Sequence, residues 1–177
     1  MASYYTYLIS SLPMLNFSIK MPFSLGVFFA KCKGLIADAN LEILGNACYQ
    51  GIDFLNTTAS GSLRKWVSFE VALRNELARV RARGKKIAPE KFIRLSDYPQ
   101  FQISHLAMAA HRHSANVLEA EKILDQERWD FLEQLSFGHY FDFDFLLIYA
   151  LKLKILERWD QVEKADKQRF FNSLALN

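Results

Sequence analysis

Apolar side chains recur every three or four residues along most of the chain, which is the spacing of one face of an α-helix. The clearest run covers residues 62–83, where Trp66, Leu73 and Leu77 share one face. Glycine commonly ends helices, so this helix is expected to stop at Gly84. The pattern predicts a long amphipathic helix with one face buried in a core.

Two further long runs follow the same spacing. One covers residues 104–135, with a break expected near 111–114, and the other covers residues 145–159. A short helix is expected near 165–174. These runs predict an all-α fold, an antiparallel helical bundle of long helices. The expected division is one helical domain over 1–177, with an N-terminal helical part at 1–61 and the main bundle at 62–177, built around helices near 62–83, 114–135 and 144–159.

The core of the bundle is expected to hold the large apolar residues on the inner faces of these helices. They are Trp66, Phe69, Leu73, Leu77, Leu124, Phe131, Leu135, Leu147, Leu151 and Ile155.

The N-terminal aromatic segment, residues 4–12, fits two conformations. Its aromatic and β-branched content favours a strand, and its spacing equally fits the first turns of a helix. Both alternatives stay open, and a strand would add a minor β component to the α fold.

Two shorter helices are expected before residue 51. Ser24 has the side chain of an N-cap and precedes helically spaced apolar residues that continue to about Ala37. Asp38 and Asn40 are alternative caps for the second helix, which is expected to end near Gln50.

Composition is that of a soluble globular protein. The 177 residues are 51% hydrophobic and 23% charged, which excludes global disorder. The 15 Phe residues indicate a bulky core or an adhesive surface. Cys32 and Cys48 show no metal or redox spacing, so free thiols in a reducing compartment are expected, with Cys32 buried and inert.

Neither a signal peptide nor a transmembrane helix is expected. The apolar N-terminus has no basic residue before Lys20 and is broken at Pro13. The apolar run 143–156 is interrupted by Lys152 and Lys154, well short of the ~20 residues that a span needs. The expected location is the cytoplasm, with membrane contact only through a partner.

Positive charge is concentrated in one segment. Net charge is only +3, too little to indicate nucleic-acid binding, but residues 62–94 hold ten basic and three acidic residues. Two alternatives stay open: this segment binds an acidic partner, or it pairs with the acidic C-terminal helices of its own bundle. The candidate partner-binding residues crowd one helix end and are Arg79, Arg81, Arg83, Lys85 and Lys86.

Acidic and basic residues at helical spacing indicate structural ion pairs. Glu70 and Arg74 are four residues apart and are interpreted as a partly buried pair. Glu121, Asp125 and Arg128 have the spacing of a salt-bridged helix face. Catalysis by these carboxylates is the less favoured alternative.

No residue pattern indicates an enzyme. The four histidines, His105, His111, His113 and His139, lack the Glu-x-x-His and His-Glu-x-x-His spacings of helical metal sites. A metal-dependent bundle enzyme would need His111 and His113 to share a metal with acidic neighbours. Neither a glycine-rich phosphate loop nor a nucleophile elbow occurs. The protein is therefore expected to be non-catalytic, without a cofactor or a metal site.

Three stretches, with their order and spacing, carry a resemblance to a known group of proteins. They are YYTYLISSLPML at 4–15, WVSFEVALRNELARVRA at 66–82, and the run from 119 to 159 that ends in HYFDFDFLLIYALKLKILERW. Together they resemble a small uncharacterised bacterial family encoded in operons for V/A-type rotary ATPases. The gene lies where that of the C-type subunit, the d-type subunit of eukaryotes, would be expected.

The C-type subunits are similar to this chain in an aromatic N-terminal segment, in helices with Glu-x-x-x-Arg spacing such as Glu70 and Arg74, and in an all-helical build. A typical C-type subunit is much longer and forms a funnel of several helical lobes, so lobes would be missing or merged here. The resemblance implies a socket between the central rotor shaft and the membrane proteolipid ring, at the cytoplasmic face of the inner membrane. Its partners would be other ATPase subunits, with no nucleic acid and the membrane reached only through the ring. The alternative is a cytoplasmic adaptor or regulatory protein–protein interaction module unrelated to the ATPase.

Overall fold

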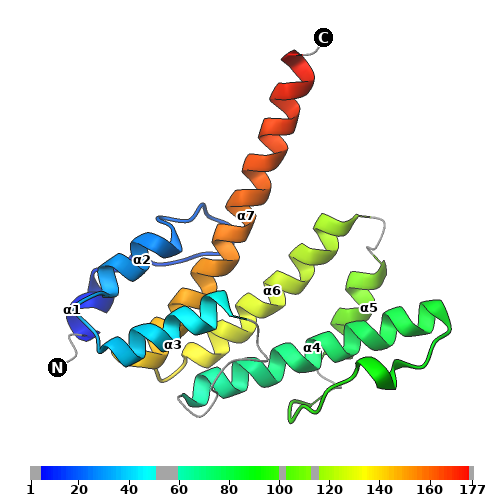
Figure 1. The fold of residues 1–177 in the computed structure, drawn as a ribbon, viewed down its shortest axis with the longest axis horizontal. Helices are drawn as coiled ribbons and strands as arrows, with labels where there is room; N and C mark the ends of the chain where they lie inside the picture. The colour runs from blue at the N-terminus through cyan, green and yellow to red at the C-terminus, as the bar shows by residue number, and fades with distance from the viewer. Residues whose placement is uncertain (1–4, 51–59, 100–102, 113–115, 176–177) are drawn as a thin grey trace. The chain divides into compact units, whose positions relative to one another are not determined.

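The computed structural model describes residues 5–50, 60–99, 103–112 and 116–175, and its regular elements there are all helices (Figure 1). No β-strand occurs in these ranges, so the predicted all-α fold is confirmed. The elements, with η3 a 3-10 helix, are α1 (Tyr5–Ser10), α2 (Leu25–Cys32), α3 (Asp38–Tyr49), α4 (Gly61–Lys85), η3 (Pro89–Phe92), α5 (Ser104–Arg112), α6 (Val117–Ser136) and α7 (Phe143–Ala175). None of the described helices is both long enough and apolar enough to cross a membrane.

The N-terminal aromatic segment is helical, which decides between the two alternatives left by the sequence. In α1 the adjacent side chains of Leu8 and Ile9 are both buried. The Tyr5 hydroxyl accepts a hydrogen bond from the Asn40 side-chain amide in α3, at 2.6 Å. Asn40 therefore holds α1 and does not cap α3.

The capping residues of α2 and α3 match the sequence only in part. The Ser24 hydroxyl accepts from the Val27 amide at 3.4 Å, as an N-cap does, so that prediction is confirmed. The helix ends at Cys32 and not near residue 37, because Gly34 takes a left-handed conformation with φ 79°. Ala37 is the N-cap of α3 and makes no side-chain cap bond, so the expected caps at Asp38 or Asn40 are wrong.

The predicted end of α4 at Gly84 is also wrong. The helix continues through Gly84 to Lys85, and Lys86 closes it in a left-handed conformation with φ 56°. At its start, the Ser60 hydroxyl accepts from the Leu63 amide at 3.0 Å. Gly138 does adopt the left-handed conformation expected of a terminator, with φ 88°, two residues after α6 ends.

The last helix is a single element where the sequence predicts two. No glycine or proline lies between residues 159 and 175, and the Lys164 ammonium contacts the Asp160 carboxylate one turn away at 2.5 Å. The break expected near 111–114 falls partly on residues 113–115, which lie outside the described residues; α5 ends at Arg112 and α6 begins at Val117.

Close contacts group the chain into two compact units. The terminal unit comprises residues 1–50 and 136–177, and the central unit comprises residues 51–135. The grouping therefore places α7 with the N-terminal helices α1, α2 and α3. The expectation that residues 1–177 form one helical domain, with parts at 1–61 and 62–177, stays a prediction.

The terminal unit is built on the first half of α7, against which α2 and α3 pack (Figure 1). Tyr149 lies at the centre of this packing. Its ring stacks on Phe28 with centroids 5.4 Å apart, and its hydroxyl donates to the Pro13 carbonyl at 3.0 Å. The Glu157 carboxylate accepts from the Leu25 amide at 3.3 Å and so meets the start of α2.

The central unit is built on α4, on which α5 and η3 pack. Side chains of α6 also contact α4: Phe69 and Phe131 stack with ring centroids 4.2 Å apart, and Tyr98 lies edge-on to both. Trp66 contacts Phe131, whereas Glu70, further along α4, contacts the earlier residue Arg128 of α6. The two helices therefore run antiparallel.

Most of the predicted core is buried. Three of the ten residues, Leu77, Phe131 and Leu135, are half-buried. The other seven are buried: Trp66, Phe69, Leu73, Leu124, Leu147, Leu151 and Ile155.

Candidate functional site

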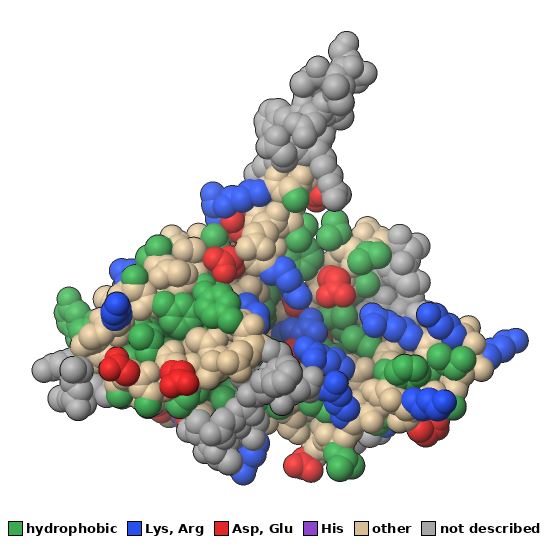
Figure 2. All heavy atoms as spheres, in the orientation of Figure 1, with side chains coloured by type: hydrophobic (Ala, Val, Ile, Leu, Met, Phe, Trp, Pro, Cys, Tyr) green, Lys and Arg blue, Asp and Glu red, His purple; other side chains and the backbone are tan. Residues whose placement is uncertain are grey.

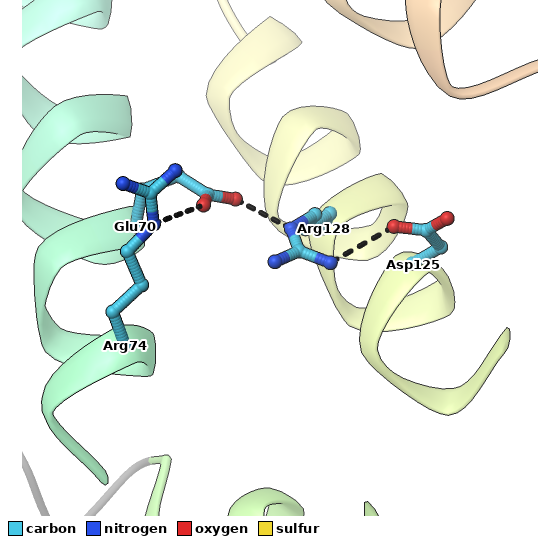
Figure 3. Close-up of polar contacts among 4 residues, drawn as sticks. All are labelled: Glu70, Arg74, Asp125 and Arg128. Carbon is cyan, nitrogen blue, oxygen red and sulfur yellow. Dashed lines mark hydrogen bonds and ion pairs between the residues drawn. The ribbon is translucent and has the colours of Figure 1, made fainter. Parts of the chain in front are cut away.

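A buried ion-pair network connects α4 and α6 within the central unit (Figure 3). The Arg128 Nε contacts Glu70 Oε1 at 2.6 Å, and its Nη1 contacts Asp125 Oδ1 at 2.9 Å. Both carboxylate side chains are buried, and Asp125 is fully excluded from solvent. The guanidinium therefore compensates two carboxylates that would otherwise be costly to bury.

The predicted pair of Glu70 and Arg74 is the weaker part of this network. Arg74 Nε lies 3.8 Å from Glu70 Oε2, and its side chain is 53% exposed against 15% for Arg128. The spacing rule found Arg74 because that rule sees only one helix. Arg128 lies 58 residues from Glu70 in the sequence, so no local spacing could reveal the closer partner.

The predicted partner-binding cluster separates into two kinds of residue. Arg79 forms an ion pair with the buried Glu76 carboxylate one turn earlier in α4, and it is only partly exposed. Four cations stay exposed, namely Arg81, Arg83, Lys85 and Lys86. Figure 2 shows Lys and Arg side chains gathered over the part of the molecule where Figure 1 draws α4.

Three aromatic residues stand exposed between α6 and α7. Phe137, Tyr140 and Phe141 are each more than half exposed, although they belong to residue types that usually pack inside. Beside them the His139 Nδ1 lies 2.6 Å from an Asp142 carboxylate oxygen, and the other oxygen of Asp142 accepts from the Phe145 amide at the start of α7. This contact anchors the segment, while the aromatic side chains face solvent.

The histidines are not gathered into a metal site in the described part of the chain. No group of three His, Cys, Asp or Glu side chains there is placed to hold an ion. His105 is exposed, the side chain of His111 is outside the described residues, and His113 lies outside them altogether.

Both thiols are buried, and burial makes them less reactive because it raises their pKa values. It raises the pKa of Cys32 to about 12. It also raises the pKa of Cys48 to about 12, with Glu157 adding to the shift and Lys154 opposing it. Since the thiolate is the nucleophile, these cysteines are packing residues.

An open hollow of about 320 Å³ lies beside the start of α4 in the central unit. Arg64 and Lys65 line it together with the apolar surface of Phe131 and Leu135. Tyr98 also lines it, and burial, followed by the nearby Glu127 carboxylate, raises the pKa of its hydroxyl. Asp97 lines the same hollow, so charges of both signs lie there beside apolar side chains.

Comparison with known proteins places the chain in a family. Residues 47–175 match the family model described as "Protein of unknown function (DUF2764)". The chain belongs to this family. No curated protein sequence and no solved structure matches the chain.

The DUF2764 match includes three of the features described above. It covers α4, α6 and α7, and with them the network of Glu70, Arg128 and Asp125. It also covers the basic end of α4 and the exposed aromatic residues before α7. The helices α1 and α2 lie outside the matched DUF2764 residues.

Proposed function

We propose that this chain is a non-catalytic subunit of a V/A-type rotary ATPase, with a place like that of the C-type (d-type) subunit between the central shaft and the proteolipid ring. The observation that carries the proposal is the resemblance of residues 4–15, 66–82 and 119–159 to the bacterial family encoded in such operons. An all-α fold agrees with a relation to the C-type subunit, which is itself built from helical lobes.

The most specific stretch of the resemblance, the run that ends at Trp159, contains the buried face of the first half of α7. From Leu146 to Leu151 every side chain of α7 is buried, and Leu153, Ile155 and Leu156 are buried after them. Residues with this role determine packing, so similarity there supports a shared fold more than a shared contact. The exposed residues of the same stretch are the better guide to partners.

Those exposed residues suit a socket. The aromatic side chains of Phe137, Tyr140 and Phe141 offer apolar area of the kind found at the centres of protein interfaces. At the end of α4, four exposed cations offer a surface for an acidic partner.

A part that transmits torque must also resist deformation. In the central unit, Arg128 of α6 pairs across the helix interface with the buried Glu70 carboxylate of α4 and within its own helix with Asp125, and Phe69 stacks on Phe131 beside them. Sliding one helix along the other would separate buried opposite charges, which is costly. This packing favours a rigid element.

The direct test is co-purification. The chain, tagged at full length and expressed in its own host, should recover V/A-type ATPase subunits from solubilised membranes. The double variant Arg81→Glu with Lys85→Glu should lower that recovery and make it more sensitive to salt, because both cations are exposed. Its thermal midpoint should stay almost constant, since exposed charges contribute only about 0–1 kcal/mol each.

The matched control is Lys91→Glu with Lys122→Glu, which reverses two exposed lysines outside the cluster. It should leave recovery unchanged. Absence of ATPase subunits from every preparation would contradict the proposal, and recovery of a different complex would favour the adaptor alternative. A large loss of thermal stability in the first variant would place the partners of the cluster within the chain itself.

A further inference from the structure

Seven positions of α4 form a second stripe on one side of the helix. They are separated alternately by three and four residues, the spacing of a coiled-coil seam. We name them the α4 seam: Arg64, Val67, Val71, Arg74, Ala78, Arg81 and Lys85.

Arg74 contacts Glu70 of the same helix at 3.8 Å, and Arg64 lines the hollow beside Phe131 of α6. The other contacts of α4 described within its own unit use other sides of the helix. Trp66, Phe69 and Glu70 face α6. Ser68 and Asn75 bond to the segment at residues 94–96, and Glu76 accepts from the Ser104 hydroxyl of α5 at 3.2 Å. Around the helix axis the α4 seam lies between these two sets of contacts.

The α4 seam is amphipathic and carries charge of one sign. Its four cations are exposed, and between them Val67, Val71 and Ala78 are half-buried. The only acidic residues of α4, Glu70 and Glu76, are buried and lie off the seam. The seam therefore places three apolar residues, which span about 16 Å, among four cations that span about 32 Å, at 1.5 Å per residue.

We propose that the α4 seam docks an acidic amphipathic α-helix of another protein. Such a helix would place apolar side chains against Val67, Val71 and Ala78 and carboxylates against the cations around them. A nucleic-acid backbone would use the cations and leave the apolar line without a partner. A second copy of this chain would bring like charges together. The inference concerns the chemistry of the partner and stands whether or not that partner is an ATPase subunit.

The test uses the full chain and a synthetic helix as the probe. The probe is a fluorescently labelled peptide of about 21 residues with Ala at a, Leu at d and Glu at e and g. Its binding is followed by anisotropy at about 50 mM and about 300 mM NaCl. The peptide should bind and should weaken with salt, while the same peptide with Lys in place of Glu should not bind.

Two variants with the same charge change on the same helix locate the site. Arg64→Glu with Arg81→Glu reverses two exposed seam cations, and Lys65→Glu with Arg83→Glu reverses two exposed cations on another side of α4. The seam variant should weaken the acidic peptide about tenfold or more, and the control variant about twofold or less. Thermal midpoints of both should stay near that of the unaltered chain.

Several results would overturn the proposal. They are failure of the acidic peptide to bind, equal effects of the two variants, equally tight binding of a single-stranded oligothymidylate, and a marked loss of stability confined to the seam variant. If the peptide binds at the seam while no ATPase subunit co-purifies with the chain, the docking inference stands and the proposed ATPase role fails.

Discussion

Among single residues, Arg128 makes the two shorter ion pairs of the network that connects α4 and α6 in the central unit. Its guanidinium lies between Glu70 of α4 and Asp125 of α6, and both carboxylates are buried. Arg74 approaches the same Glu70 from solvent at a longer distance. Two arginines therefore contact the Glu70 carboxylate. The Arg128 side chain is largely buried, whereas the Arg74 side chain is exposed to water.

Replacing these two arginines by the same residue should separate their roles. Arg128→Met removes the cation that both buried carboxylates contact, and it leaves Glu70 with only the exposed Arg74 at 3.8 Å. It should lower the free energy of unfolding by about 3–5 kcal/mol. Arg74→Met should cost about 0–1 kcal/mol, because the pair it removes is exposed. Urea unfolding followed by circular dichroism measures both.

A compensating variant checks the cause. Adding Glu70→Gln and Asp125→Asn to Arg128→Met removes the uncompensated charges and should recover part of the lost stability. Equal losses for Arg128→Met and Arg74→Met would show that the network contributes no more than a surface pair. A lack of recovery in the triple variant would show that the loss has a cause other than uncompensated buried charge.

At the scale of the helices, the sequence predicts that a helix forms better than it predicts the residue at which the helix ends. Periodicity over many residues reveals a long helix such as α4 or α6, whereas an end depends on one residue's conformation. Gly84 lies inside α4 although glycine often stops helices, and Lys86, a residue with a Cβ, takes the left-handed position. Gly138 takes the left-handed position that glycine favours.

The two glycines should therefore respond oppositely to alanine. At Gly84 a Cβ meets nothing within 4 Å and the residue is helical, so Gly84→Ala should stabilise the protein by about 0.5–1 kcal/mol. At Gly138 the space is equally open but φ is 88°, so Gly138→Ala should cost about 1–2 kcal/mol. Thermal unfolding of both variants gives the comparison, and destabilisation by Gly84→Ala would contradict the helical assignment.

For the molecule as a whole, the sequence predicts the fold class and much of the core but not which helices pair. The apolar faces of Trp66 and Leu73 or of Leu147 and Leu151 show that each helix has an inner side. Nothing local states that Glu70 meets Arg128, or that α7 packs with α2 and α3. Such pairings depend on how loops bring distant faces together, and one helical period is compatible with many partners.

The candidate binding surfaces are likewise predicted only in part by the sequence. The basic end of α4 is visible in the sequence as a cluster of cations. The sequence does not show which of these cations is held in an ion pair and which are exposed. Arg79 is held by Glu76, whereas Arg81 and Lys85 continue the seam that begins at Arg64. Exposure of Phe137, Tyr140 and Phe141 likewise needs the fold, because the same residues would serve equally well in a core.

The proposed role of the whole molecule is to couple the shaft of a rotary ATPase to its membrane ring. Electron cryomicroscopy of the V/A-type ATPase, purified from membranes through the tagged chain, would locate the chain in the complex. We expect helical density that fits the central and terminal units between the central shaft and the cytoplasmic side of the proteolipid ring. A complete ATPase map with that position filled by another protein and no density for this chain would contradict the proposed role.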